Sequence, residues 1–144
     1  MNINGLNLRS QRQGDVPMFD GVEYRAAQVM ERLVAWVADD KQTASMGKLP
    51  ANAVVTNVRI QVTEAFNSDG TDLISVGYSG AATAFATTTD VSTTGIKSPT
   101  LGTSAGFNAT ARDVEAYYTN GGSEPTTGKA LVVLEFYRVP EQVA

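Results

Sequence analysis

The clearest pattern of hydrophobic and polar positions lies in residues 49–63. Residues 49–52 (LPAN) have the composition of a turn. After it, two sets of side chains alternate along the chain: Val54, Thr56, Val58, Ile60 and Val62 in one set, and Val55, Asn57, Arg59, Gln61 and Thr63 in the other. A period of two with β-branched residues is typical of an antiparallel strand that buries one face. We therefore predict a half-buried strand here, with each set on its own face.

A second strand is expected soon after the first. Residues 67–70 (NSDG) have the composition of a turn, and Gly70 can adopt a positive φ. Residues 73–78 (LISVGY) then supply a short apolar run rich in β-forming side chains. Two such runs on either side of a turn predict a β-hairpin.

Hydrophobic periodicity alone leaves residues 22–38 open between helix and strand. Ala26, Met30 and Leu33 recur at helical spacing, whereas Val29, Leu33 and Ala35 also fit the alternation of a strand. We favour two strands, at residues 28–38 and 42–48, with a turn between them at residues 39–41 (DDK).

The second half of the chain also indicates strands. Residues 79–111 are mostly small and uncharged, which predicts short strands and long loops lying against the core or a neighbouring subunit. Residues 112–118 alternate again, and residues 119–128 (TNGGSEPTTG) are predicted to be a flexible connection. Residues 130–137 (ALVVLEFY) are apolar at nearly every position, which predicts a central strand covered on both sides.

Together these elements predict an all-β fold, an antiparallel β-sandwich or jelly roll. Residues 1–21 are polar and rich in Gly, Asn and Gln, so we interpret them as an extended N-terminal arm. Residues 22–144 are then a single β-sandwich domain. The arm is either a frayed chain end or a segment that becomes ordered against a neighbouring subunit.

Composition argues against most enzyme classes. The chain has no cysteine and no histidine, which excludes a disulfide framework, a zinc–thiolate site and a Ser-His-Asp triad. The remaining candidates are carboxylate pairs, namely Asp39 with Asp40, Asp69 with Asp72, and Asp113 with Glu115. The first two pairs lie in predicted turns, where Asp is favoured for local hydrogen bonds, and the third lies on a solvated strand face. We therefore predict no catalytic residue, no cofactor and no metal site.

The net charge and the hydropathy of the chain argue against two classes of binding partner. The net charge is −4, the isoelectric point is near 4.7, and Lys and Arg occur singly, so we expect no nucleic-acid partner. No apolar run approaches the ~18 residues of a membrane span, so we expect no membrane partner. The first residues show no signal peptide, which predicts synthesis in the cytoplasm without export.

Two weaker patterns suggest a binding function. Residues 67–72 (NSDGTD) are rich in oxygen ligands, but no Glu closes an EF-hand loop, so an ordinary Asx turn is favoured. Several aromatic residues offer a possible sugar-binding face, although aromatic residues in strands belong more often to the core. These residues are Trp36, Tyr117, Tyr118, Phe136 and Tyr137.

Two longer segments resemble a known group of virion proteins. One runs through residues 49–56 (LPANAVVT), 65–72 (AFNSDGTD) and 74–77 (ISVG), and the other is residues 127–136 (TGKALVVLEF). Over approximately residues 44–139 the chain is similar to tailed-bacteriophage capsid decoration (cement) or head-auxiliary proteins. The arm is not part of this similarity.

The resemblance implies a β-sandwich subunit that assembles, often as a trimer, on an icosahedral shell, and it transfers no catalytic residue. The predicted function is therefore a virion structural protein that binds the outside of an assembled phage capsid and stabilises it. Its expected partners are the major capsid protein and further copies of itself, on the capsid surface of the virion. The alternatives are a phage tail or neck structural protein and a carbohydrate-binding β-sandwich module.

On this hypothesis the arm supplies contacts outside its own subunit. Its apolar residues and the two basic residues beside them are the expected subunit or capsid contacts: Ile3, Leu6, Leu8, Arg9 and Arg12.

Overall fold

The computed structural model describes residues 18–19, 22–23, 28–35 and 43–139. Every regular element among them is a strand, and none of them forms a helix long and apolar enough to cross a membrane. Strands β1 (Met18–Phe19) and β2 (Val22–Glu23) form a small antiparallel pair. The sandwich itself is a separate compact unit that spans Ala27–Val139.

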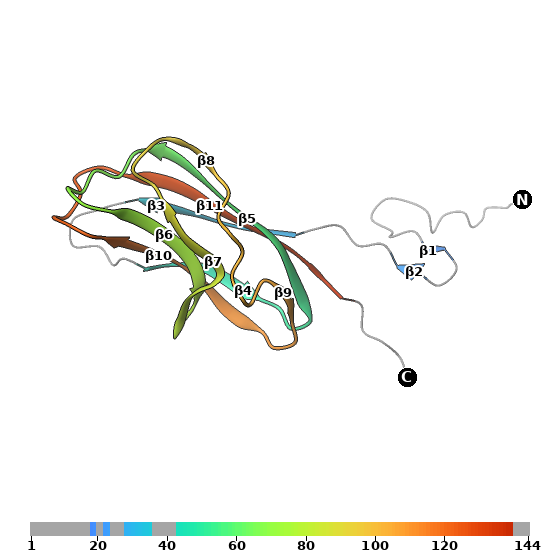
Figure 1. Ribbon diagram of the computed structural model, residues 1–144. Coiled ribbons are helices and arrows are strands. Elements are labelled where there is room, and N and C mark those ends of the chain that lie inside the picture. Colours follow the sequence, from blue (N-terminus) through green and yellow to red (C-terminus); the bar gives the residue numbers. More distant parts are fainter. Residues whose placement is uncertain (1–17, 20–21, 24–27, 36–42, 140–144) are drawn as a thin grey trace, which may run out of the picture. The chain divides into compact units, whose positions relative to one another are not determined.

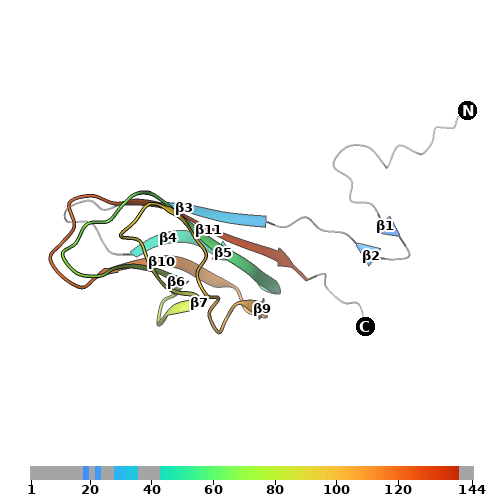
Figure 2. The same ribbon diagram turned by 45° about the horizontal axis from the view of Figure 1, so that its top comes forward.

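Two antiparallel sheets make up the sandwich and appear as two layers in Figures 1 and 2. The five-stranded sheet contains β3 (Gln28–Ala35), β11 (Lys129–Arg138), β5 (Ala53–Glu64), β8 (Gly95–Lys97) and β9 (Gly106–Asn108), with both β8 and β9 paired to β5. The four-stranded sheet contains β4 (Thr43–Leu49), β10 (Arg112–Asn120), β6 (Asp72–Tyr78) and β7 (Ala81–Asp90).

The hydrophobic core lies between the sheets and is built by alternation along their central strands. Alternate side chains of β11 are buried, namely Ala130, Val132, Leu134 and Phe136. The facing set on β10 is Val114, Ala116 and Tyr118. The predicted all-β sandwich is thus confirmed. Strands also form at β3 and β4, as expected, while residues 36–42 lie outside the described residues.

The simple alternation predicted for residues 54–63 is wrong at its beginning. Val58, Ile60 and Val62 are buried as expected, but before them the buried residue is Val55, and Val54 is only partly buried. The register with β11 shifts between Glu135 and Phe136, which marks a β-bulge. An extra residue in one strand reverses the direction of all side chains before it.

The predicted hairpin between residues 49–63 and 73–78 is also wrong. Strand β5 lies in the five-stranded sheet and β6 in the four-stranded sheet. Residues 65–71 therefore connect the two layers, which in a sandwich lie roughly 10 Å apart. Phe66 is buried beneath this connection and stacks on Tyr118, with 4.7 Å between ring centroids. Alternation reveals which positions of a strand are buried but not which strand it pairs with.

The connection predicted to be flexible at residues 119–128 is held by specific hydrogen bonds. The Asn67 Oδ1 atom accepts hydrogen bonds from the backbone N–H groups of Thr126 and Thr127, at 2.7 and 3.1 Å. The backbone N–H of Ser123 donates to Asp69 Oδ1 at 2.5 Å. These contacts join residues 65–71 to residues 121–128. The two connections between the sheets therefore hold each other in place.

The small-residue region contains the predicted short strands, β8 and β9, joined by a long loop, but it begins with a strand that was not expected to be long. Strand β7 is long and pairs with β6, and its residues Ala84, Phe85 and Ala86 are buried in the core. Residues 98–105 then run along the free edge of β7, where the Gly102 N–H donates to the Phe85 carbonyl at 2.9 Å. A Cβ atom on Gly102 would lie 2.2 Å from the Thr83 carbonyl oxygen, so this close approach requires glycine.

Candidate interaction surface

The central strand β11 is covered on one side only, contrary to the prediction. Its inward side chains are buried, whereas Leu131 and Val133 on the outward side are partly exposed and Tyr137 is 41% exposed. An apolar side chain that points outward stays in contact with water unless another segment or molecule covers it. The outward face of the five-stranded sheet is therefore the feature of the fold that most needs an explanation.

One apolar row crosses this face from strand to strand. Tyr137 on β11 pairs with Val54 on β5, and Val54 pairs with Phe107 on β9. Directly opposed residues in adjacent strands point to the same side of a sheet. Phe107 is 58% exposed. We call these three residues the outer row.

A shallow hollow of about 210 Å³ lies on the same face. Its apolar walls are Ile96, Leu131 and Val133, and its polar walls are Arg59 and Gln61. The register confirms a common face, because Leu131 pairs with Gln61 and Gln61 pairs with Ile96. Ile96 is the most exposed large hydrophobic residue of the described chain, at 69%.

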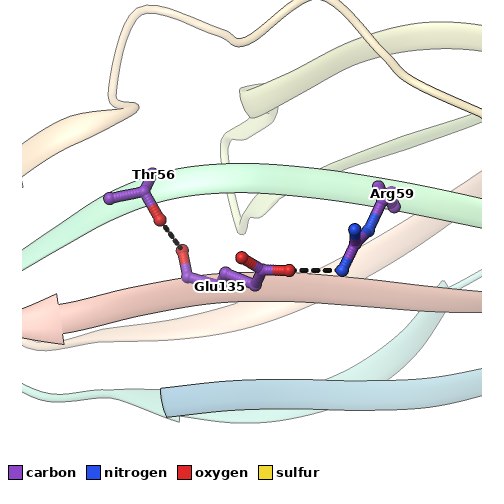
Figure 3. A network of polar contacts seen from close by, with 3 residues as sticks. All are labelled: Thr56, Arg59 and Glu135. Carbon is purple, nitrogen blue, oxygen red and sulfur yellow. Dashed lines mark hydrogen bonds and ion pairs between the residues drawn. The ribbon is translucent and has the colours of Figure 1, made fainter. Parts of the chain in front are cut away.

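One ion pair lies on this face (Figure 3). The Arg59 guanidinium donates to Glu135 Oε2, and the Thr56 hydroxyl donates to the Glu135 carbonyl at 3.2 Å. Both charges are partly exposed, so the pair adds at most about 1 kcal/mol to stability. Its main effect is to neutralise the two charges beside the apolar side chains.

The β-bulge in β5 is what turns Val54 outward. Without the extra residue, Val54 would share the buried face with Val58, and Val55 would point outward. The Thr56 hydroxyl bond to β11 stabilises the bulge, and Thr63 makes the same kind of bond to the Lys129 carbonyl at the second register shift. Bulges commonly redirect side chains next to functional surfaces. The outward position of Val54, and with it the outer row, therefore depends on this β-bulge.

The arm residues predicted to make contacts lie outside the described residues. These are Ile3, Leu6, Leu8, Arg9 and Arg12. Their assignment stays a prediction.

The aromatic residues considered for sugar binding do not share a face. Tyr118 and Phe136 are buried in the core, Tyr117 faces outward from the four-stranded sheet, and Tyr137 faces outward from the other sheet. Trp36 lies outside the described residues. Among the described aromatic residues considered for this role, the fold thus forms no common sugar-stacking platform.

Each carboxylate of the two described pairs has a structural contact. Asp72 Oδ1 accepts from the Tyr118 hydroxyl at 2.5 Å, and Glu115 accepts from the Tyr117 hydroxyl at 2.7 Å. Burial and the bond to Glu115 raise the pKa of Tyr117 to about 12. The hydrogen bond from the Ser123 backbone lowers the pKa of Asp69, and Asp113 lies 3.9 Å from the Lys48 ammonium. No group of three acidic side chains suited to a metal ion occurs in the part of the chain that the structure describes.

Sequence reasoning missed the residues that carry the exposed face, above all Ile96 and Phe107. Both are isolated large apolar residues in a stretch of Gly, Ser, Thr and Ala, and each directly follows a glycine with positive φ. A large apolar side chain in such a stretch is a signal that could have identified them.

Comparisons with known proteins identify the fold. No protein-family model and no curated protein matches the chain. A chain of the structure described as the cyanophage Pam1 capsid asymmetric unit matches at a TM-score of 0.65 and 20% identity, covering 96% of this chain and 100% of that one.

Two further phage capsid structures contain similar chains. In the acid-stable capsid of Helicobacter pylori bacteriophage KHP30 the TM-score is 0.58, with 16% identity over 80% of this chain and 90% of that one. In the capsid of Ralstonia phage GP4 the TM-score is 0.55, with 17% identity over 90% of this chain and 93% of that one. The resemblance to phage virion proteins is thus confirmed as a likeness of fold.

Proposed function

We propose that this protein is a virion structural protein that binds the outside of an assembled phage capsid and stabilises it. The observation that carries the proposal is the similarity, over 80% to 96% of this chain, to chains of three phage capsid structures. The exposed apolar face supports it, because a surface that remains apolar in the isolated subunit suits a protein that works within an assembly.

Stabilisation follows from selective binding. A protein that binds the mature lattice, but not its separated subunits, shifts the equilibrium toward the lattice. Individual contacts can be weak if the protein binds as a trimer, because a second attachment point is held at high effective concentration by the first. The proposed partners are thus the major capsid protein and two further copies of this chain.

The arm is the proposed attachment element. Ile3, Leu6 and Leu8 supply apolar side chains for contacts outside the subunit, and Arg9 and Arg12 supply positive charge. Removing residues 2–16 should reduce occupancy on shells at least tenfold while leaving the sandwich folded, because every described core residue lies beyond them. Circular dichroism and thermal unfolding verify the fold of the truncated protein.

The experiment is sedimentation of the purified protein with assembled, mature shells of the same phage that lack it. We expect the full-length protein to pellet with shells and to raise their disruption temperature. Unassembled major capsid protein, used at equal mass, should not bind it. Failure to bind shells, or a virion copy number far below that of the major capsid protein, would overturn the proposal and indicate a tail or neck protein.

A further inference from the structure

The outward face of the five-stranded sheet lacks a cover within the described part of its own chain. Val29, Ile96 and Phe107 are 52%, 69% and 58% exposed, and Tyr137 extends the apolar surface toward the end of β11. Soluble proteins rarely leave an extended apolar patch without an interaction partner. The segment that covers this face should therefore carry apolar side chains of its own.

The chain supplies such a segment in its N-terminal arm. Its large apolar residues before residue 15 are Ile3, Leu6 and Leu8, together with Met1. The chain enters this same sheet from the N-terminal side at Gln28, which pairs with Phe136, directly beside Tyr137 of the outer row. Outside the β1–β2 pair, the thirteen residues 9–17 and 24–27 between Leu8 and Gln28 span up to about 45 Å when extended, a length on the scale of a small domain.

Charge also favours a second copy of this chain as the partner of the arm. Up to Gly14 the arm carries Arg9 and Arg12 and no acidic residue. Asp15 and Asp20 bring the whole arm, residues 1–21, to a net charge of zero, and residues 28–139 carry 8 basic and 11 acidic residues, a net charge of −3. The positive tip of the arm, residues 1–14, is therefore attracted to the body of another copy, and this attraction increases the rate of encounter.

We infer that the N-terminal arm of one copy covers the outward face of the five-stranded sheet of a second copy. One of Ile3, Leu6 and Leu8 fills the hollow beside Ile96, and the others pack on the outer row. This inference deepens the proposed function, since it rests on the homo-oligomer and names its contact. In a closed ring such as a trimer, each arm covers the face of the next copy.

Disulfide cross-linking tests this contact directly, because the natural chain has no cysteine. A tagged Leu6→Cys variant is mixed with an untagged Ile96→Cys variant and oxidised. We expect a cross-linked dimer that contains both chains, at a yield at least fivefold above that of a control pair. The control pairs Leu6→Cys with Thr119→Cys, because Thr119 is an exposed residue next to the inward-facing Tyr118 of the four-stranded sheet.

Two results would overturn the inference. One is a yield with Ile96→Cys no higher than with the control. The other is a Leu6→Cys/Ile96→Cys double variant that closes its disulfide within one chain, because the arm would then cover its own subunit.

Sedimentation equilibrium without shells provides the second measurement. Both Leu6→Ser/Leu8→Ser and Ile96→Ser/Phe107→Ser should weaken self-association at least tenfold, whereas Leu101→Ser should not, since Leu101 is exposed but lies beside β7. Unchanged association of either double variant would contradict the inference. Shell binding is measured separately, so a failed arm contact with normal shell binding overturns only this inference, and association without shell binding overturns only the proposed function.

Discussion

The outward faces of the two sheets differ in chemistry although both sheets are built by the same alternation. On the four-stranded sheet, the outward positions of β10 are Asp113, Glu115, Tyr117 and Thr119. Their neighbours on β4 include Thr43 and Ser45, both exposed. On the five-stranded sheet, the corresponding positions carry Val54, Ile96, Phe107, Leu131, Val133 and Tyr137, with the Arg59–Glu135 ion pair among them.

Under the proposed function, this difference separates what folding requires from what assembly requires. A sandwich requires only that the inward positions be apolar, and a polar outward face is sufficient for a sheet in contact with water. The four-stranded sheet follows that rule. Apolar outward residues on the five-stranded sheet add little to the stability of the isolated subunit, so we attribute them to contacts made in the assembly.

The largest expected effect is a difference in unfolding free energy between variants of two adjacent β10 residues, whose side chains point to opposite sides of the sheet. Tyr118→Ala removes a buried ring stacked on Phe66 and the hydroxyl that donates to buried Asp72, which should lower the free energy of unfolding by about 3–5 kcal/mol. Tyr117→Ala on the polar outward face should cost only about 1 kcal/mol. Urea denaturation of both variants measures the difference, and equal losses would show that this outward face also stabilises the fold.

A smaller effect is expected at alkaline pH, where Tyr117 titrates. Its pKa in the folded protein is raised to about 12, above the ordinary value of 10, because burial and the bond to Glu115 favour the protonated hydroxyl. The resulting stabilisation is complete below pH 10 and is lost as the pH rises toward 12. Tyr117→Phe should therefore lose less stability than the natural protein between pH 10 and about 12.

Urea midpoints at several pH values provide this measurement. Tyr118 titrates in the same direction, since burial and the bond to Asp72 raise its pKa, so the loss in the Tyr117→Phe protein should be reduced rather than absent. Parallel pH profiles for the two proteins would contradict the prediction.

The smallest effect concerns the bulge that produces the outer row. Thr56→Val removes the hydroxyl bond to the Glu135 carbonyl but keeps a β-branched side chain. The site is exposed, so we expect a loss of at most about 1 kcal/mol in unfolding free energy. Weakened self-association in this variant, with unchanged association in the matched Thr119→Val variant on the other sheet, would show that the bulge positions Val54 for contact.

Much of the secondary structure could be predicted from local pattern. The alternation of β10 and the apolar run of β11 correctly identified two central strands, and the strand favoured for residues 28–38 is present as β3. Pairing could not be predicted in the same way. Strand β5 has one buried side whether it joins β6 in a hairpin or faces it across the core. Tertiary contacts of the connecting residues, such as the stacking of Phe66 on Tyr118, accompany the second arrangement.

The sequence by itself determined that the chain is a β-sandwich without cysteine or histidine chemistry, because alternation and composition are local properties. Tertiary structure alone decided which side chains share a surface. A single extra residue at the bulge turns Val54 outward, and strands distant in sequence then bring Phe107 and Tyr137 beside it. The apolar face exists because register and strand order are set by packing between the sheets, which no local pattern encodes.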